Sequence, residues 1–341
     1  MGYIESPWIQ HCGGTESVAE RTKYMSRLGQ RVAKPTSIGG QALIEGVMMK
    51  GPKEMAIAVR NPENEIIIKK EPVEGFVTKY KLNKIPFLRG GLALIDSMIT
   101  GVRSLNYAAD IAMPEEETDK EPGRFEAFLG KIFGEKLGDI MIYFSVFVAL
   151  IMSVGIFILG PTLLTGVLKN FIKNIVVLNL MEGVLRLVLF VVYIAVISRM
   201  EDIRRVFQYH GAEHKTIYCY ENGEELTVEN VRKYTTLHPR CGTSFLFIVM
   251  MVSMVIFSLI EWSDPITRML TRLALLPVVA GISYEIIRIA GRSQSALMSI
   301  VSYPGMMMQK LTTLEPDDSQ IEVAIEALKG VLVENEDDAR W

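Results

Sequence analysis

Three of the four histidines in the 341-residue chain lie within 29 residues of one another, near the middle of the sequence. His210, Glu213 and His214 form the pattern His-x-x-Glu-His, which occurs in zinc hydrolases with an inverted binding motif. On a helix, two imidazoles four positions apart lie about 5–6 Å apart at Cβ and can share one ion. On a strand, the same spacing spans about 13 Å, which is too far for one metal. The motif therefore requires a helix or a tight loop.

His238 and Cys241 follow as His-x-x-Cys and would complete a donor set that suits zinc. Three protein ligands plus a water, with Glu213 as general base, would make a catalytic zinc site, in which His210, His214 and His238 would hold the ion and Cys241 would be a fourth or exchangeable ligand. Four ligands, His210, His214, His238 and Cys241, would make a closed structural site. The third alternative has no metal, with the histidines hydrogen-bonded to Glu213 and to backbone or lipid groups. The residues alone leave these three alternatives open.

A second cluster of interest lies in residues 37–49, where Gly39 and Gly40 precede Glu45. Paired glycines allow backbone amides to turn toward an anion, or allow close packing. Glu45 could act as a metal ligand or as a base, or it could form a hydrogen bond that supports one of the metal ligands. The alternative is a buried turn and strand in which Glu45 forms a salt bridge.

Four apolar stretches have the length and composition of membrane helices. They must position the histidine motif and the other candidate site residues. They cover residues 140–168, 174–198, 242–260 and 273–289. A mean hydropathy of +0.25 with only 22% charged residues is also typical of a membrane protein rather than a disordered chain. The sequence therefore predicts four spans.

Two of these stretches contain ionisable residues at helical spacing. Glu182 and Arg186 lie four apart, in the favourable order for an ion pair, and Glu285 and Arg288 lie three apart. An unpaired charge inside a membrane is costly, so we expect intramembrane pairing in both cases.

The distribution of basic residues predicts the orientation of the chain. The long segment between the second and third stretches holds Arg199, Arg204, Arg205, Lys215, Arg232, Lys233 and Arg240, whereas the opposite loops hold only Lys169, Lys173, Arg268 and Arg272. Basic loops stay in the cytoplasm. This rule places residues 199–241 and both termini in the cytoplasm, and residues 1–36 lack the apolar core of a signal peptide.

The remaining segments are assigned from local patterns. Residues 55–60 and 65–70 flank the turn-rich Asn61–Asn64 and predict a β-hairpin, and residues 88–110 have helical spacing with apolar residues at 92, 95, 98, 99, 102 and 105. The predicted chain begins with a flexible lead-in (1–36), a cytoplasmic α+β region (37–110) and an acidic linker with an amphipathic helix (111–138). A four-span membrane domain follows (139–292), and its cytoplasmic loop (199–241) contains the histidines. The chain ends with an interfacial or re-entrant segment broken at Ser302–Gly305 (293–312) and an acidic C-terminal helix capped by Asp318 or Ser319 (313–341).

Composition excludes several classes of protein. A net charge of −3 gives no nucleic-acid signature, and three cysteines are too few for a disulfide framework.

Three motifs in this order resemble those of the YqhQ-like family of bacterial membrane proteins. They are Ile38-Gly-Gly-Gln-Ala-Leu-Ile-Glu-Gly-Val-Met-Met49, Phe207-Gln-Tyr-His-Gly-Ala-Glu-His-Lys-Thr216 and His238-Pro-Arg-Cys-Gly-Thr-Ser-Phe245. The resemblance extends over residues 37–330. It implies a bacterial inner-membrane protein, and members of this family are described as predicted metal-dependent enzymes.

The predicted fold is thus an α-helical integral membrane protein of about four spans, with a small cytoplasmic α+β region. The leading functional hypothesis is a zinc-dependent hydrolase acting at the cytoplasmic membrane interface, on a peptide bond or a lipid head group. The competing hypothesis is a membrane-protein assembly, insertion or scaffold factor with a structural metal or none. Its partners would be membrane lipids, other membrane proteins, the protein-export channel or the ribosome.

Overall fold

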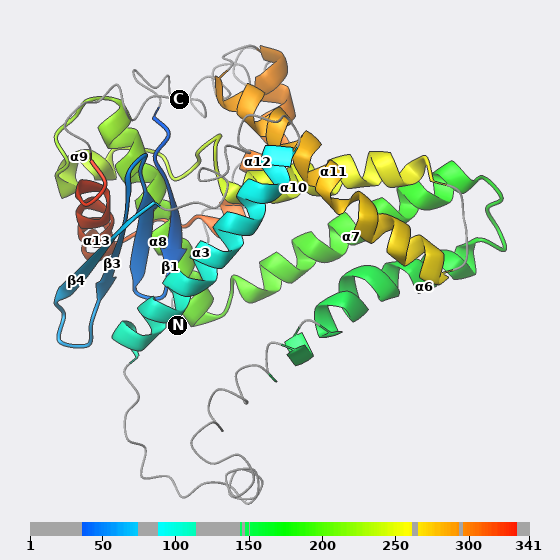
Figure 1. Cartoon of the computed structure of the whole chain (residues 1–341), viewed down its shortest axis with the longest axis horizontal. Helices are drawn as coiled ribbons and strands as arrows, with labels where there is room; N and C mark the ends of the chain where they lie inside the picture. Colours follow the sequence, from blue (N-terminus) through cyan, green and yellow to red (C-terminus); the bar gives the residue numbers. More distant parts are fainter. Residues whose placement is uncertain are drawn as a thin grey trace, which may run out of the picture.

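The architecture was obtained from a computed structural model, which describes residues 36–73, 88–113, 144, 147–149, 151–260, 265–292 and 296–332. A small sheet and the helices around it form one part, and a group of apolar helices extends from it (Figure 1). The predicted lead-in, nearly all of the acidic linker and the last residues of the acidic tail lie outside the described residues.

The sheet is an antiparallel meander of four strands in the order β1-β2-β3-β4. The strands are β1 (Gly39–Leu43), β2 (Gly46–Lys50), β3 (Glu54–Arg60) and β4 (Ile66–Pro72). The β3–β4 hairpin predicted around Asn61–Asn64 is present, with Arg60 paired to Ile66. The turn between β1 and β2 places Glu45 at a φ of 50°, a left-handed conformation that is uncommon for a residue with a side chain.

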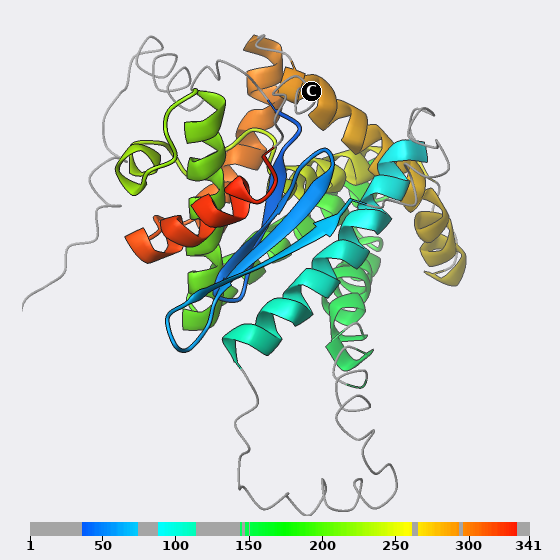
Figure 2. The ribbon, with the colours of Figure 1, turned by 60° about the vertical axis from the view of Figure 1, so that its left-hand side comes forward.

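The two faces of the sheet are covered by different helices because side chains alternate along each strand. Helices α8 (Glu201–Glu221) and α13 (Asp318–Lys329) pack on one face, against Val47, Met49, Ala56 and Ala58. Helix α3 (Leu88–Ala112) covers the other face, where Leu43, Met48, Ile57 and Val59 are buried with Ala108. Figure 2 shows the sheet between α13 and α3.

Helix α13 contributes the apolar stripe expected of the C-terminal helix. Ile321, Ala324 and Leu328 are fully buried. The predicted N-cap, Asp318 or Ser319, is wrong by one or two residues. Asp317 caps the helix instead, because its carboxylate accepts the Gln320 N–H while the Gln320 side chain accepts the Asp317 N–H.

Helix α3 forms where the sequence predicts a helix, but its apolar face is not the one that packs on the sheet. Ile95, Met98, Ile99 and Val102 are each more than half exposed. Contact with the sheet is made on another face, by the fully buried Ala108 together with Tyr107 and Ile111. The four large apolar residues on the opposite face of α3 therefore remain on the surface.

Within the described residues, three helices are long and apolar enough to cross a membrane. They are Phe147–Leu168, Ile175–Ile197 and Met269–Ile289. The first includes a π-helical turn, η3 (Gly155–Leu159), and continues into α6 (Gly160–Leu168). The second is α7 (Ile175–Ile197), and the third lies within α11 (Pro265–Arg292). Large apolar side chains are exposed along all three.

The predicted span over residues 242–260 is a shorter helix, α10 (Gly242–Ser258), which has 17 residues. At 1.5 Å per residue it is about 26 Å long, somewhat less than the ~30 Å of a bilayer core. It packs against α7, α11 and α12. The structure thus supports three helices of spanning length where the sequence predicts four.

Two segments are more helical than predicted. The helix expected for the histidine motif in residues 199–241 is present as α8, and with the short α9 (Val228–Arg232) it occupies most of this predicted loop. Helix α8 is rich in polar residues, but one of its faces is buried against the sheet. The predicted break at Ser302–Gly305 is also absent. Helix α12 (Ala296–Thr312) runs through Pro304, and Gly305 packs directly on Ser244 of α10.

Gly211 lies in the middle of α8, where the backbone of the segment between α12 and α13 crosses the helix. A Cβ at this position would lie 1.9 Å from the carbonyl oxygen of Leu314. We expect Gly211→Ala to lower the free energy of unfolding by about 1–3 kcal/mol, because backbone rather than a flexible side chain must move. Chemical denaturation monitored by circular dichroism would measure this loss.

The matched control is Gly166→Ala in α6, where a Cβ would meet nothing within 4 Å. Alanine is the better helix former by up to about 1 kcal/mol, so this variant should be neutral or slightly more stable than wild type. An equal loss of stability in both variants would show that the contact with Leu314 is not the cause.

Candidate metal centre

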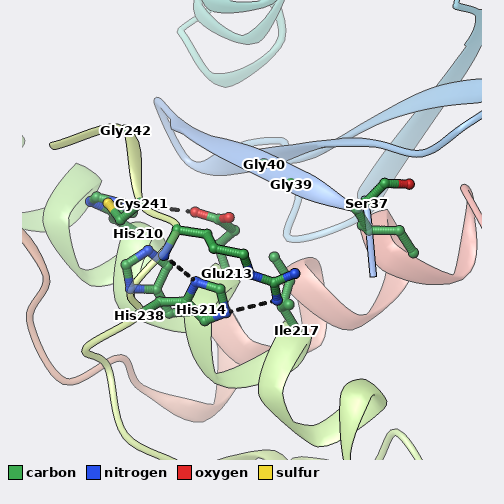
Figure 3. A pocket seen from close by; sticks show the side chains of 12 residues that line it. Ser37, Gly39, Gly40, His210, Glu213, His214, Ile217, His238, Cys241 and Gly242 are labelled. Atoms are coloured by element: carbon green, nitrogen blue, oxygen red, sulfur yellow. Dashed lines mark hydrogen bonds and ion pairs between the residues drawn. The ribbon is translucent and has the colours of Figure 1, made fainter. Parts of the chain in front are cut away.

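A pocket lies where three segments distant in the sequence meet. Its walls are the start of β1 (37–40), the middle of α8 (210–217) and the segment that leads into α10 (238–242). Figure 3 shows the residues of α8 close beneath the β1 ribbon at Gly39 and Gly40. The cavity has a volume of about 130 Å³, several times the ~30 Å³ that one water molecule occupies.

Helix α8 supplies two imidazoles whose orientation is fixed by backbone carbonyls. The Nδ1 atom of His210 lies 2.9 Å from the carbonyl oxygen of Thr312, and Nδ1 of His214 bonds to that of Thr236. A carbonyl can only accept, so we assign the proton of each ring to Nδ1. Both Nε2 atoms then carry a free lone pair. This is the arrangement that orients metal-ligating histidines in proteins.

Cys241 brings a thiol to the same point. Its Sγ lies 3.2 Å from Nε2 of His210, and the residue caps the N-terminus of α10. Ligand atoms of His210, His214 and Cys241 all lie within 4.8 Å of one another. Imidazole nitrogen and thiolate sulfur are typical zinc ligands. The three side chains, of which His214 and Cys241 are buried, therefore fit a zinc ion.

Glu213 is the carboxylate next to this cluster. One of its oxygens lies 3.9 Å from Nε2 of His210, and the backbone N–H of Gly40 donates to it. The residue is only 5% exposed. Burial raises the pKa of Glu213 above its usual range, and the nearby His210 and the Gly40 N–H oppose that rise.

His238 is close to the cluster but is not part of it. Its ring stacks edge-on to Tyr218, with 4.7 Å between ring centroids, and its Nε2 lies 3.9 Å from a carboxylate oxygen of Glu221. Burial lowers the pKa of His238 to about 3, so the ring is neutral at physiological pH. The structure thus brings together three of the four predicted ligands, with Cys241 in the place expected of His238. The His238 ring instead contacts Arg240, whose backbone N–H donates to Nδ1 at 3.3 Å, and lies near Glu221.

Two residues that the sequence analysis did not identify, Glu221 and Gln309, keep His238 and Arg240 in position. Glu221 is buried and pairs with Arg240, and it also accepts from the backbone N–H of Thr36 at 2.6 Å. The buried Gln309 of α12 accepts from the His238 N–H and donates to the His238 carbonyl, both at 2.7 Å. Their partners lie 19 to 185 positions away in the chain, so no local pattern could have identified them.

Comparison with known proteins places this site in a family. A model described as "Protein of unknown function (DUF1385)" matches residues 85–334. The chain is also 35% identical over 304 residues to "Uncharacterized protein YqhQ" of Bacillus subtilis (strain 168), which covers 87% of this chain and 93% of that protein. The chain belongs to the DUF1385 family. No solved structure matches it. The DUF1385 match includes α8 and α10, and with them all three members of the donor cluster.

Glu45 of this DUF1385 protein does not reach the metal centre. Its two carboxylate oxygens accept from Nε and Nη2 of Arg205, both at 2.5 Å, and it also accepts from the Tyr209 hydroxyl at 3.3 Å. The residue is absent from the pocket lining. The predicted hydrogen bond from Glu45 to a metal ligand is therefore not formed, because this carboxylate joins the β1–β2 turn to the first half of α8.

The intrahelical charges lie away from the pocket, on the apolar helices. Glu182 is fully buried and accepts from Arg186, as the spacing predicts, but also from Arg272 of α11 at 2.6 Å and from Thr162 of α6 at 2.9 Å. Arg186 donates in addition to the carbonyl of Phe157 in the π-helical turn. Glu285 and Arg288 are 3.9 Å apart. Glu182 thus connects three helices.

Proposed function

We propose that this protein is a zinc-dependent hydrolase of the bacterial inner membrane, with its active site at the cytoplasmic surface. The observation that carries the proposal is the convergence of His210, His214 and Cys241, with both imidazoles held at Nδ1 by backbone carbonyls so that Nε2 is the atom available to an ion. Three protein ligands are typical of catalytic zinc sites, which keep an open position. His238 lies outside the donor cluster, in contact with Arg240 and near Glu221, which supports this interpretation over a closed four-ligand site.

Each side chain has a distinct role in this proposal. His210, His214 and Cys241 would hold the ion, and Thr312 and Thr236 keep the two rings in place through their carbonyls. When bound, zinc supplies a Lewis acid and lowers the pKa of a water molecule toward 7. Glu213 is the nearest carboxylate and would take the proton of the attacking water. The Gly40 N–H holds that carboxylate in position.

The apolar helices support the membrane location. Their exposed residues are mainly aliphatic, including Leu163, Val188 and Leu273, which is what a lipid environment favours. The side of the molecule that carries α8 holds most of the basic residues of the loops between apolar helices. By the positive-inside rule, that side and the metal centre face the cytoplasm.

A second candidate function is a non-enzymatic assembly or insertion factor, and α3 favours it. The exposed Ile95, Met98, Ile99 and Val102 form an apolar surface of the kind that binds another membrane protein or lipid. In that case the protein-export channel or the ribosome would be a partner to test, and the metal would only stabilise α8 against α10.

The test of the hydrolase uses full-length protein purified in detergent, wild type beside Glu213→Gln. Mass spectrometry of the metal should find about one zinc per chain in both proteins, because the amide preserves the size of the buried side chain. Hydrolysis of dye-labelled casein and of vesicles with labelled phospholipid head groups should be seen only with wild type. We expect Glu213→Gln to lower the rate by about 10²–10⁴-fold, the usual contribution of a general base.

Two results would contradict the proposal. One is a folded wild-type protein that holds no zinc even after zinc is added. The other is a zinc-loaded Glu213→Gln variant that is as active as wild type, which would leave a structural metal and the assembly-factor function.

A further inference from the structure

Strand β1 is an edge strand, and the candidate metal centre opens along it. Among the described strands, β1 pairs only with β2. Residues 37–40, at the beginning of β1, form one wall of the pocket. Figure 3 shows the strand crossing above Glu213 at Gly40. An edge strand presents a row of backbone donors and acceptors to whatever lies beside it.

The direction of these backbone groups follows from the ladder. In an antiparallel pair, alternate residues direct N–H and C=O toward the partner strand or away from it. The Gly40 N–H donates to Glu213 rather than to β2, so Gly40 belongs to the outward set, and Ala42 follows with the same direction. The outward backbone of β1 therefore begins at the carboxylate of the proposed general base.

The glycines leave room for a ligand beside this edge. Both Gly39 and Gly40 are exposed, and a Cβ on Gly39 would meet nothing within 4 Å. A residue with a side chain at position 39 would extend into that open space. The structure thus combines a strand whose first two residues are exposed with a pocket wall in which Gly39 leaves open space.

The charges of the pocket argue against an anionic ligand. Arg240 is the one arginine or lysine in the lining. Its guanidinium pairs with the buried Glu221 and donates to the carbonyl of Thr36. With a divalent ion bound, the Cys241 thiolate and the Glu213 carboxylate would balance its two positive charges. A phosphate group would find no net positive charge there, whereas a neutral amide needs none.

We propose that the substrate is a peptide, bound in an extended conformation with its backbone paired to the outward edge of β1. This inference rests on the proposed hydrolase function and names its substrate class. Strand addition to an exposed edge is a general mode of peptide recognition, in which main-chain hydrogen bonds supply the affinity. In the reaction, the oxygen of water bonds to the amide carbon and the C–N bond breaks. Glu213 takes one proton from the water and returns it to the leaving nitrogen. The products are a carboxylic acid and an amine, and transfer of the remaining water proton from the acid to the amine leaves a carboxylate and an ammonium group.

The test compares four hydroxamates that share the same metal-binding group. They are acetohydroxamate, a hydroxamate with a Leu-Ala-Ala tail, the same tail with N-methylated amides, and a hydroxamate linked to phosphoethanolamine. Binding is measured by calorimetry on zinc-loaded full-length protein in detergent. We expect the peptide probe to bind at least tenfold more tightly than its N-methylated form, because methylation removes the donors that would pair with β1. The phosphoethanolamine probe should bind no better than acetohydroxamate.

Each other outcome overturns the inference in a distinguishable way. Equal affinity of the two peptide probes would exclude backbone pairing, and tightest binding of the phosphoethanolamine probe would identify a lipid head group as substrate. In both cases the metal centre itself would stand. If no hydroxamate binds, acetohydroxamate included, the proposed hydrolase fails and the peptide inference fails with it.

A substitution at Gly39 tests where the peptide tail lies. Gly39→Leu fills open space outside the donor cluster and should leave zinc content unchanged. It should weaken the peptide probe at least tenfold, with Gly39→Ala intermediate. Unchanged peptide affinity in Gly39→Leu would place the tail away from β1 and contradict the proposal.

Discussion

Cys241→Ser protein will bind zinc about 100-fold more weakly than wild type, in a competition titration with a chromogenic chelator. The thiolate of Cys241 is the one sulfur donor of the cluster, and it stands 3.2 Å from Nε2 of His210. A serine hydroxyl keeps its proton at neutral pH and is a poor ligand for zinc, whereas a thiolate is a strong one. Removing a residue that only hydrogen-bonds to a metal ligand already lowers metal affinity by about 10–100-fold. Removing a ligand itself should therefore lower the affinity by at least the larger of these factors.

The protein offers a matched control in its other buried cysteine on the described part of the chain. Cys219 lies on α8, fully buried, and its Sγ is 3.5 Å from the carbonyl oxygen of Glu225. Burial raises the pKa of the Cys219 thiol to about 11, so it stays protonated. Cys219→Ser should therefore keep the zinc affinity of wild type. Similar losses in both variants would mean that serine disturbs the fold rather than the metal centre.

Glu182→Gln should lower the free energy of unfolding by about 3–5 kcal/mol, the usual consequence of removing one partner from a buried ion pair. Glu182 is completely buried among apolar helices and accepts from both Arg186 and Arg272. Without its negative charge, two guanidinium groups would remain close together with no counter-charge. Unfolding by sodium dodecyl sulfate in mixed micelles would measure the difference.

Glu322→Gln is the control for this second experiment. The Glu322 carboxylate also accepts from an arginine, Arg60, at 2.9 Å, but its side chain is 52% exposed. Exposed pairs contribute about 0–1 kcal/mol, so this variant should be close to wild type. If Glu182→Gln were equally mild, α6, α7 and α11 would be held together by apolar packing alone.

Local patterns were sufficient for the core of the candidate site. His210, Glu213 and His214 share one face of a helix because their spacing matches its period, and Cys241 follows where a polar segment gives way to an apolar helix. The β3–β4 hairpin was predictable for the same reason, since turn-forming residues separate two strands of suitable composition. In each case the deciding contacts lie within a few residues of one another.

Long-range contacts explain most of what sequence reasoning missed. His238 and Glu45 have side chains suited to a metal site, but Glu221 and Arg205 engage them instead. The pairing of Arg272 with Glu182 joins residues 90 positions apart. The large apolar residues of α3 follow helical periodicity, but periodicity does not tell which face the sheet covers. The sheet covers the face that holds Tyr107, Ala108 and Ile111.

The position of β1 in the chain has a consequence for when the centre can exist. Gly40 and Glu213 touch although 173 positions (213 − 40) separate them, and the apolar hairpin of α6 and α7 lies between. The centre also needs Cys241 and the carbonyl of Thr312, which holds the His210 ring. The pocket is therefore complete only after residue 312 has been synthesised, so a shorter ribosome-bound chain would lack any hydrolytic activity.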